Sequence, residues 1–320
     1  MKKESGLLLL FSLFFIVLTE AQRTASACIS NDSVRITYYT QGSGEPILLI
    51  PGGPGYGASC LFSLADSLDK VLSRFHDHPL HFTYIIPDLR GTGKSTIPTK
   101  DIGRKVNFEH IITDLEAIRQ QLGFAHWTVL GHSFGGFLAE YYAGKFPSVI
   151  DHLILLSSPD PVSWGWAINI PSHAEMRLPP SSSSLLDSIQ AMMKPGNNED
   201  SLKSVYDRIM LPIYVFRAED TLKLMAAMKN MAVNMQVFRS LSEGFYSAKK
   251  TILNNISQYI NPVLILHGRM DPMGEGVAYE NQKILPSASL QFLGNAGHFL
   301  WIENAFSTAN LIRFFFFQKK

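Results

Sequence analysis

The sequence has little cysteine and almost no charge surplus. Only Cys28 and Cys60 occur among 320 residues, which excludes a small disulfide-stapled fold. Lysine and arginine number 28 against 27 acidic residues, and no basic stripe stands out, so nothing indicates a nucleic-acid partner. Hydrophobic residues make up 46% and charged residues 17%, which argues against disorder and favours one large α/β domain or two small ones.

The N-terminal apolar run, residues 6–18, is too short for a comfortable transmembrane span. It follows Lys2 and Lys3 and precedes an A-x-A pattern at residues 25–27. These features predict a signal peptide over residues 1–27 and a secreted or periplasmic protein with no stable membrane insertion after cleavage. The alternatives are an uncleaved N-terminal membrane anchor or a lipoprotein modified at Cys28. A disulfide between Cys28 and Cys60 stays open.

Nucleotide-binding motifs are also absent. Residues 91–95 read GTGKS, like the end of a phosphate-binding loop, but Asp88 stands where that loop needs a glycine. No G-x-G-x-x-G follows a strand. His76, His78 and His81 could bind a metal, although a solvated loop is the favoured interpretation. We therefore expect no cofactor and no metal.

Short strand-like runs alternate with helical patterns in most of the chain. Apolar residues recur at helical spacing over 61–75, 108–122 and 305–317, and a further helix follows Ser133. The strand-like runs cover residues 34–40, 47–50, 82–86, 127–130, 153–156, 262–266 and 290–293. This alternation predicts an α/β fold with a mostly parallel sheet covered by helices on both faces.

The alternation stops between residues 161 and 260, where we expect a mainly helical cap inserted between two parts of the core, 28–160 and 261–320. Eight of the eleven methionines lie in this cap, together with Trp164, Trp166, Phe238 and Phe245. Such residues can line an adaptable apolar pocket over Ser133, or form only the core of the cap itself.

The stretch Gly131-His-Ser133-Phe-Gly135 lies between the strand at 127–130 and a helix. A serine on so sharp a turn exposes its hydroxyl, and the turn needs small residues two before and two after it. The glycines at these positions meet that need. Ser133 is therefore the predicted nucleophile.

A nucleophilic serine needs a base, an acid that orients the base, and donors for the oxyanion. His298 follows the strand at 290–293, and Asp271 follows the strand before it, which gives the order serine, aspartate, histidine. Asp160, after the strand at 153–156, is the alternative acid. The predicted oxyanion donors are the amides of Phe134 and Gly53, with Gly52 as the second choice.

These residues resemble the α/β-hydrolase superfamily. Four stretches are similar to proline iminopeptidases: residues 51–55 (PGGPG), 88–95 (DLRGTGKS), 131–136 (GHSFGG) and 268–271 (GRMD). The resemblance implies an α/β-hydrolase fold and removal of N-terminal residues from short peptides without metal or cofactor. It also implies acidic cap residues that hold the amine of the substrate, for which Glu175, Glu219, Asp220 and Glu243 are available.

Three functions stay open at this point. A proline iminopeptidase-like serine aminopeptidase leads, and a carboxylesterase or lipase for small acyl esters is second, because the form Gly-His-Ser-Phe-Gly is common among esterases. Either enzyme would take a small molecule or a short peptide as substrate. A non-catalytic binding protein on the same fold is the third.

Overall fold

The structure is a computed structural model, and it describes residues 22–75, 79–163, 165–285 and 287–317. Most of the predicted signal peptide, together with His76, His78 and Trp164, lies outside these ranges.

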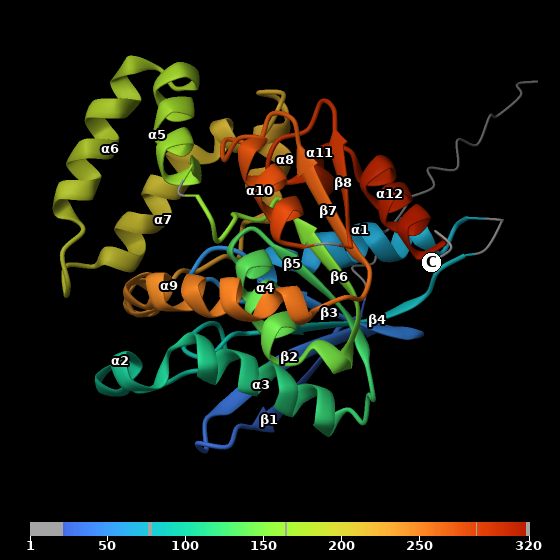
Figure 1. Ribbon diagram of the computed structural model, residues 1–320. Helices are drawn as coiled ribbons and strands as arrows, with labels where there is room; N and C mark the ends of the chain where they lie inside the picture. Colours follow the sequence, from blue (N-terminus) through green and yellow to red (C-terminus); the bar gives the residue numbers. More distant parts are fainter. Residues whose placement is uncertain (1–21, 76–78, 164, 286, 318–320) are drawn as a thin grey trace, which may run out of the picture.

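An eight-stranded sheet forms the centre of the molecule (Figure 1). Its order is β1-β2-β4-β3-β5-β6-β7-β8, with β2 antiparallel to both of its neighbours and all pairs from β4–β3 onward parallel. The strands are β1 (Thr24–Ile29), β2 (Arg35–Gly42), β3 (Glu45–Ile50), β4 (Phe82–Pro87), β5 (Trp127–His132), β6 (Ile150–Leu156), β7 (Val263–Gly268) and β8 (Ala288–Leu293). The predicted mostly parallel α/β architecture is confirmed.

Sequence analysis missed β1, because its first residues were assigned to the signal peptide. Ala25, the first residue of the A-x-A pattern, pairs with Tyr39 of β2, and Ala27 pairs with Thr37. Cleavage behind Ala27 would therefore leave only Cys28 and Ile29 of this strand. The boundary of the signal peptide stays a prediction.

Helices cover both faces of the sheet (Figure 1). One face carries α1 (Phe62–Leu72), α11 (Leu300–Glu303) and α12 (Ala305–Phe317), whose buried side chains share one hydrophobic cluster. The other carries α3 (Phe108–Gln121), α4 (Phe134–Lys145), α9 (Met235–Asn255) and α10 (Gly276–Ile284), which contribute to a second cluster. The short α2 (Ile102–Lys105) precedes α3.

Side chains of one strand alternate between the two clusters. Ile47 and Leu49 of β3 belong to the cluster of α1, while Leu48 and Ile50 belong to that of α4, because successive residues of a strand point to opposite faces.

The two cysteines are separated by the sheet. Cys28 and Cys60 are both buried and free, and they lie in opposite clusters, so they form no disulfide.

The described part of the segment between β6 and β7 is mainly helical. It contains α5 (Gly165–Arg177), α6 (Pro180–Met192), α7 (Glu199–Met210) and α8 (Asp220–Ala227), followed by α9. A small cluster of its own joins Leu178, Leu186, Met210 and Ile213. The buried side chains of α9, apart from Met235, instead belong to the cluster of α4. The division of the chain at residues 160 and 261 stays a prediction.

Glu140 of α4 is a buried acid within this core. It has no exposed surface, and neither carboxylate oxygen has a hydrogen-bond partner among the described residues. Burial, and then the nearby Asp160, raises the pKa of Glu140 well above its ordinary value. The carboxyl group of the folded chain therefore keeps its proton to a higher pH than that of the unfolded chain, which ionises above a pH of about 4.3.

This difference predicts a pH-dependent stability. Because the folded-state pKa is raised, the contribution of Glu140 is most favourable below the unfolded pKa and is lost as pH rises toward the folded pKa, by up to about 1.4 kcal/mol per pH unit. Glu140→Gln cannot ionise. In urea unfolding, its stability relative to wild type should rise between pH 5 and 8, whereas the exposed Glu243→Gln should follow wild type. Parallel curves for Glu140→Gln and wild type would contradict the prediction.

Candidate active site

The predicted site residues follow strands that end at one edge of the sheet. Gly53 follows β3, Ser133 follows β5, Asp271 follows β7 and His298 follows β8. These four strands are parallel, so their carboxyl ends meet at the same edge. Ligands of open α/β sheets bind there.

Ser133 sits on a strained turn between β5 and α4. Its backbone has φ 53° and ψ −129°, which a residue with a side chain rarely adopts. Its amide donates to the carbonyl of Leu156 in β6 at 2.9 Å, so the neighbouring strand holds the turn in place. The side chain is half-buried at the start of the helix.

Two glycines make this turn possible. A Cβ atom on Gly131 would lie 2.2 Å from the carbonyl oxygen of Gly135, across the turn. A Cβ atom on Gly135 would lie 2.1 Å from the carbonyl oxygen of Ile50 in β3. Both contacts are with backbone atoms, which cannot rotate away, so the requirement for small residues around Ser133 has a direct steric cause.

His298 and Asp271 form a buried hydrogen-bonded pair. The distance from His298 Nδ1 to Asp271 Oδ2 is 2.8 Å. An ionised carboxylate can only accept, so Nδ1 carries the hydrogen and Nε2 is left as the basic nitrogen. Burial opposes the charge on Asp271, but His298, His267 and the amide of Met273 outweigh it and hold its pKa well below the usual range.

Asp160 makes different contacts. Its Oδ1 accepts from the amides of Val162 (2.8 Å) and Ser163, and its Oδ2 accepts from the Ser163 hydroxyl at 2.8 Å. It therefore closes the turn that leads out of β6. Of the two candidate acids, only Asp271 bonds to His298 within the described residues.

The loop after β3 packs directly against the serine turn. A Cβ atom on Gly52 would lie 2.9 Å from Ser133 Cβ. Gly53 has φ +64°, a conformation that favours glycine. Phe134 is the first residue of α4, so its N–H has no partner within the helix. The β3 loop and the start of α4 thus both lie against Ser133.

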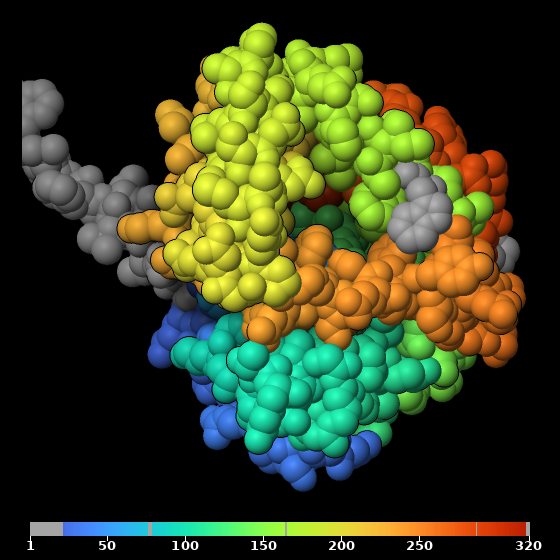
Figure 2. Space-filling view, turned by 90° about the vertical axis from the view of Figure 1, so that its left-hand side faces the viewer, coloured from blue at the N-terminus to red at the C-terminus, as the bar shows by residue number. Residues whose placement is uncertain are grey.

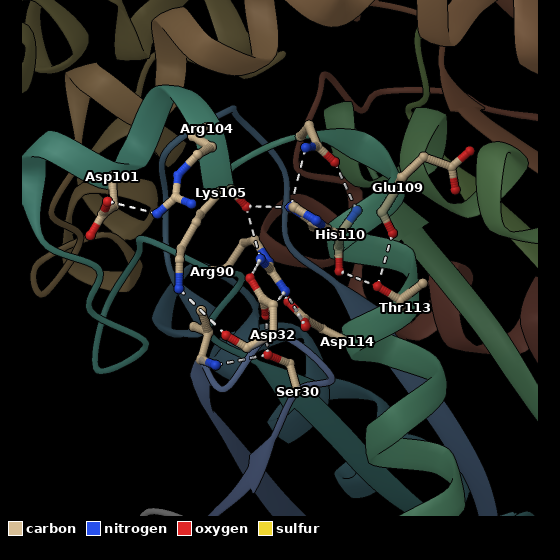
Figure 3. A network of polar contacts seen from close by, with 12 residues as sticks. Ser30, Asp32, Arg90, Asp101, Arg104, Lys105, Glu109, His110, Thr113 and Asp114 are labelled. Carbon is tan, nitrogen blue, oxygen red and sulfur yellow. Dashed lines mark hydrogen bonds and ion pairs between the residues drawn. The ribbon is translucent and has the colours of Figure 1, made fainter.

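Asp88, after β4, holds this loop in position. Its carboxylate accepts from the amide of Ala58 in the β3 loop and from that of Lys94, each at 2.8 Å. Two residues later in the chain, the side chain of Arg90 also fixes this segment. Its guanidinium makes a bidentate pair with Asp114 of α3, at 2.7 and 2.6 Å, and reaches Asp32 at 3.1 Å (Figure 3). The motif at residues 88–95 therefore has a structural role, because its side chains hold neighbouring segments in position.

His132 packs behind the site. Its ring lies against that of His298, with centroids 4.8 Å apart, and its Nε2 is 3.1 Å from the His298 carbonyl oxygen. Burial lowers the pKa of His132 to about 3, so this imidazole is neutral. It donates to the carbonyl and adds no positive charge beside His298.

The cap is tied to the loop that carries His298. The His298 amide donates to the Tyr214 carbonyl at 2.8 Å. The Glu303 carboxylate accepts from the amides of Gly297 at 2.6 Å and Phe216 at 2.5 Å. One carboxylate thus clamps a core loop and a cap segment together.

A cavity of about 430 Å³ lies between the core and the cap. Figure 2 shows a hollow bounded by the yellow and lime cap helices and the orange α9, with green and red segments at its floor. Its lining includes Gly52, Gly53, Ser133, Phe134 and His298, and from the cap Trp166, Lys203, Asp207, Met228, Met231, Phe238 and Phe245. The predicted apolar pocket is present, although Met176, Met192 and Met225 are exposed and contribute nothing to it.

The acidic cap residues expected at the cavity are not there. Glu175, Glu219 and Glu243 are exposed, and Asp220 pairs with Lys223 away from the lining. Asp207 lines the cavity instead. The sequence does not reveal it, because no motif marks an acid on an inserted helix.

Among the described residues, no helix is long and apolar enough to cross a membrane, and no three metal-ligating side chains converge.

The chain is similar to a known protein family over most of its length. Residues 45–305 match the model of the alpha/beta hydrolase fold family. The chain belongs to this family. Over 292 residues it is 29% identical to a putative proline iminopeptidase of Mycoplasma genitalium, covering 83% of this chain and 89% of the relative. It is also 25% identical to Lipase 3 of a Moraxella species over 272 residues, covering 84% and 76%.

A solved structure agrees with the fold. An α/β fold family hydrolase from Bacillus anthracis superposes with a TM-score of 0.70 at 15% identity, covering 92% of this chain and 99% of that one. The predicted resemblance to α/β-hydrolases of the proline iminopeptidase kind is confirmed. Relatives named as peptidases and as lipases both support a hydrolase.

The contacts of Gly135 predict a sharp loss of stability on substitution. Gly135→Ala should lose about 3 kcal/mol or more of unfolding free energy in urea, because neither the helix start nor the Ile50 backbone can yield. Gly103→Ala on α2 is the matched control, since its added Cβ would meet nothing within 4 Å. The control should be neutral or slightly stabilising. Equal stability of the two variants would contradict the steric account.

Proposed function

We propose that the protein is a serine hydrolase with Ser133 as nucleophile, His298 as general base and Asp271 as the residue that orients it. The observation that supports this most is the buried His298–Asp271 pair beside a cavity that Ser133 also lines. In the proposed reaction, His298 Nε2 takes the proton of the Ser133 hydroxyl as its oxygen attacks a carbonyl carbon. The carboxylate of Asp271 then stabilises the imidazolium that forms.

The amides of Gly53 and Phe134 would hold the oxyanion of the tetrahedral intermediate. Both belong to backbone that is fixed before substrate arrives: Asp88 braces the loop of Gly53, and α4 begins at Phe134. Preorganised donors of this kind contribute on the order of 3–4 kcal/mol each to catalysis. His298 would return its proton to the leaving group, and water would release the acyl group from Ser133.

The leading substrate class is the short peptide with a free N-terminus, as for a proline iminopeptidase-like aminopeptidase. Similarity over most of the chain to relatives of that name supports it. The carboxylate of Asp207, on the cap side of the cavity, supplies a negative charge that could face a substrate ammonium. A prolyl residue would fit the apolar lining.

A carboxylesterase or lipase activity is the second candidate. It is favoured by the largely apolar lining and by the ion pair of Asp207 with Lys203, which already neutralises the acid. A non-catalytic binding protein is the remaining alternative. Covalent labelling of folded wild-type protein by a fluorophosphonate separates it from both enzymes, since only an activated serine reacts.

Export is also part of the proposal. The positively charged start, the apolar run at 6–18 and the A-x-A pattern favour a secreted or periplasmic protein, with an uncleaved membrane anchor as the alternative. N-terminal sequencing of the mature chain decides between them and locates the cleavage site relative to β1.

Ser133→Ala should fold normally and lower kcat by at least about 10,000-fold, because it removes the attacking oxygen. The measurement is kcat/KM on prolyl p-nitroanilide and on p-nitrophenyl butyrate, with circular dichroism as the check on folding. Preference of wild type for the prolyl amide would support the aminopeptidase, and turnover of the ester alone would support the esterase. Full activity of Ser133→Ala would place the nucleophile elsewhere.

Asp271→Asn should lower kcat by about 10,000-fold, because an amide cannot fix the His298 tautomer or balance the imidazolium. Asp160→Asn is the matched control. Asp160→Asn removes a charge beyond the carboxyl end of the neighbouring strand β6. We expect near wild-type kcat, with some loss of stability from weaker bonds to Val162 and Ser163. The reverse pattern of kcat values would assign the acid role to Asp160.

A further inference from the structure

Lys203 is a cation held inside the proposed substrate cavity. It lies on α7, and its side chain is only 16% exposed. Its ammonium pairs with the carboxylate of Asp207, one helical turn later, and both residues line the cavity. Among the described residues that line the cavity, Asp207 is the only acid, and its carboxylate is thus already paired with an ammonium of the chain itself.

Three aromatic rings also surround this ammonium. Lys203 Nζ lies 5.9 Å from the ring centroid of Tyr56, 5.6 Å from that of Tyr206 and 5.9 Å from that of Phe238. Aromatic faces attract cations at such distances, more strongly where water is excluded. We call Tyr56, Tyr206, Asp207 and Phe238 together the ammonium cage.

The ammonium cage lies beside the proposed oxyanion loop. A Cβ atom on Gly53 would lie 2.4 Å from the Tyr56 ring, so that ring rests on the proposed donor. The Tyr56 hydroxyl donates in turn to the Asp207 carboxylate. The Tyr56 ring therefore connects the cage to the proposed oxyanion loop.

An ordinary helix-surface ion pair does not explain this arrangement. Lysine four residues before aspartate is the less favourable order for such a pair, because it runs against the helix dipole. A surface pair also needs neither the phenol of Tyr56 from a distant core loop nor the ring of Phe238 from α9. The arrangement matches what a small ammonium ligand would require.

We infer that Lys203 is a specificity-determining residue that occupies the ammonium cage and competes with the ammonium of a substrate for it. The inference rests on the proposed function for the position of the reacting carbonyl. A substrate ammonium binds only when Lys203 has left the cage. Its apparent association constant is therefore the intrinsic one multiplied by the fraction of time that the cage is empty. A neutral acyl ester does not need the cage and avoids this competition.

The test is Lys203→Met, which keeps the apolar stem and removes the ammonium. The ratio of kcat/KM on prolyl p-nitroanilide to that on p-nitrophenyl butyrate should rise about tenfold, through a lower KM for the amine. Lys223→Met is the matched control, because it removes the same charge from a Lys–Asp pair on α8 outside the cavity. An unchanged or lower ratio for Lys203→Met would overturn the inference.

A binding measurement separates this inference from the proposed function. Prolinol, a small amine without a scissile carbonyl, is titrated by calorimetry into Ser133→Ala and into Ser133→Ala with Lys203→Met. The second variant should bind about tenfold more tightly, and adding Asp207→Asn should abolish that gain. Equal affinities would overturn the inference even if wild type reacts with a fluorophosphonate. Tighter binding without fluorophosphonate labelling of wild type would uphold the cage and reject the serine hydrolase.

Discussion

The site depends on the close approach of backbone atoms around Ser133. Because Gly131 and Gly135 lack side chains, β5 can turn into α4 within one residue while β3 passes against the helix start. Ser133 can then hold a strained backbone conformation, since its amide donates a hydrogen bond to the Leu156 carbonyl of β6. That same proximity brings the loop of Gly53 beside the serine. Ser133, the proposed nucleophile, and the β3 loop beside it thus owe their positions to the same steric feature.

Much of the core site could be predicted because strand ends are visible in the sequence. Apolar runs bounded by glycine and proline located β3, β5, β7 and β8, and parallel strands bring their carboxyl ends to one edge. Chain order then paired His298 with Asp271, and the structure places a hydrogen bond between them. The sequence left Asp160 as the alternative acid, and in the structure its carboxylate bonds to its own turn and not to His298.

The cap side could not be predicted in the same way. Which face of α7 meets the cavity depends on how inserted helices pack, and no periodicity in the sequence specifies it. Asp207 was missed for this reason, and exposed acids such as Glu243 were chosen instead. Strand β1 was missed because an export signal and an edge strand use similar small residues. The unpartnered carboxyl of Glu140 has no sequence signal either, because a helical glutamate is ordinarily exposed.

The clamp at Glu303 has a consequence for substrate size. Its carboxylate binds the histidine loop and the cap at once, and the Tyr214 carbonyl does the same through the His298 amide. Lifting this part of the cap would therefore break hydrogen bonds that hold the loop of His298, the proposed base. In the proposed enzyme, a molecule that fits beneath the cap would leave these bonds intact, whereas one that displaces the cap would release the histidine loop. The hydrogen bonds of Glu303 and Tyr214 would thus limit the size of its substrates.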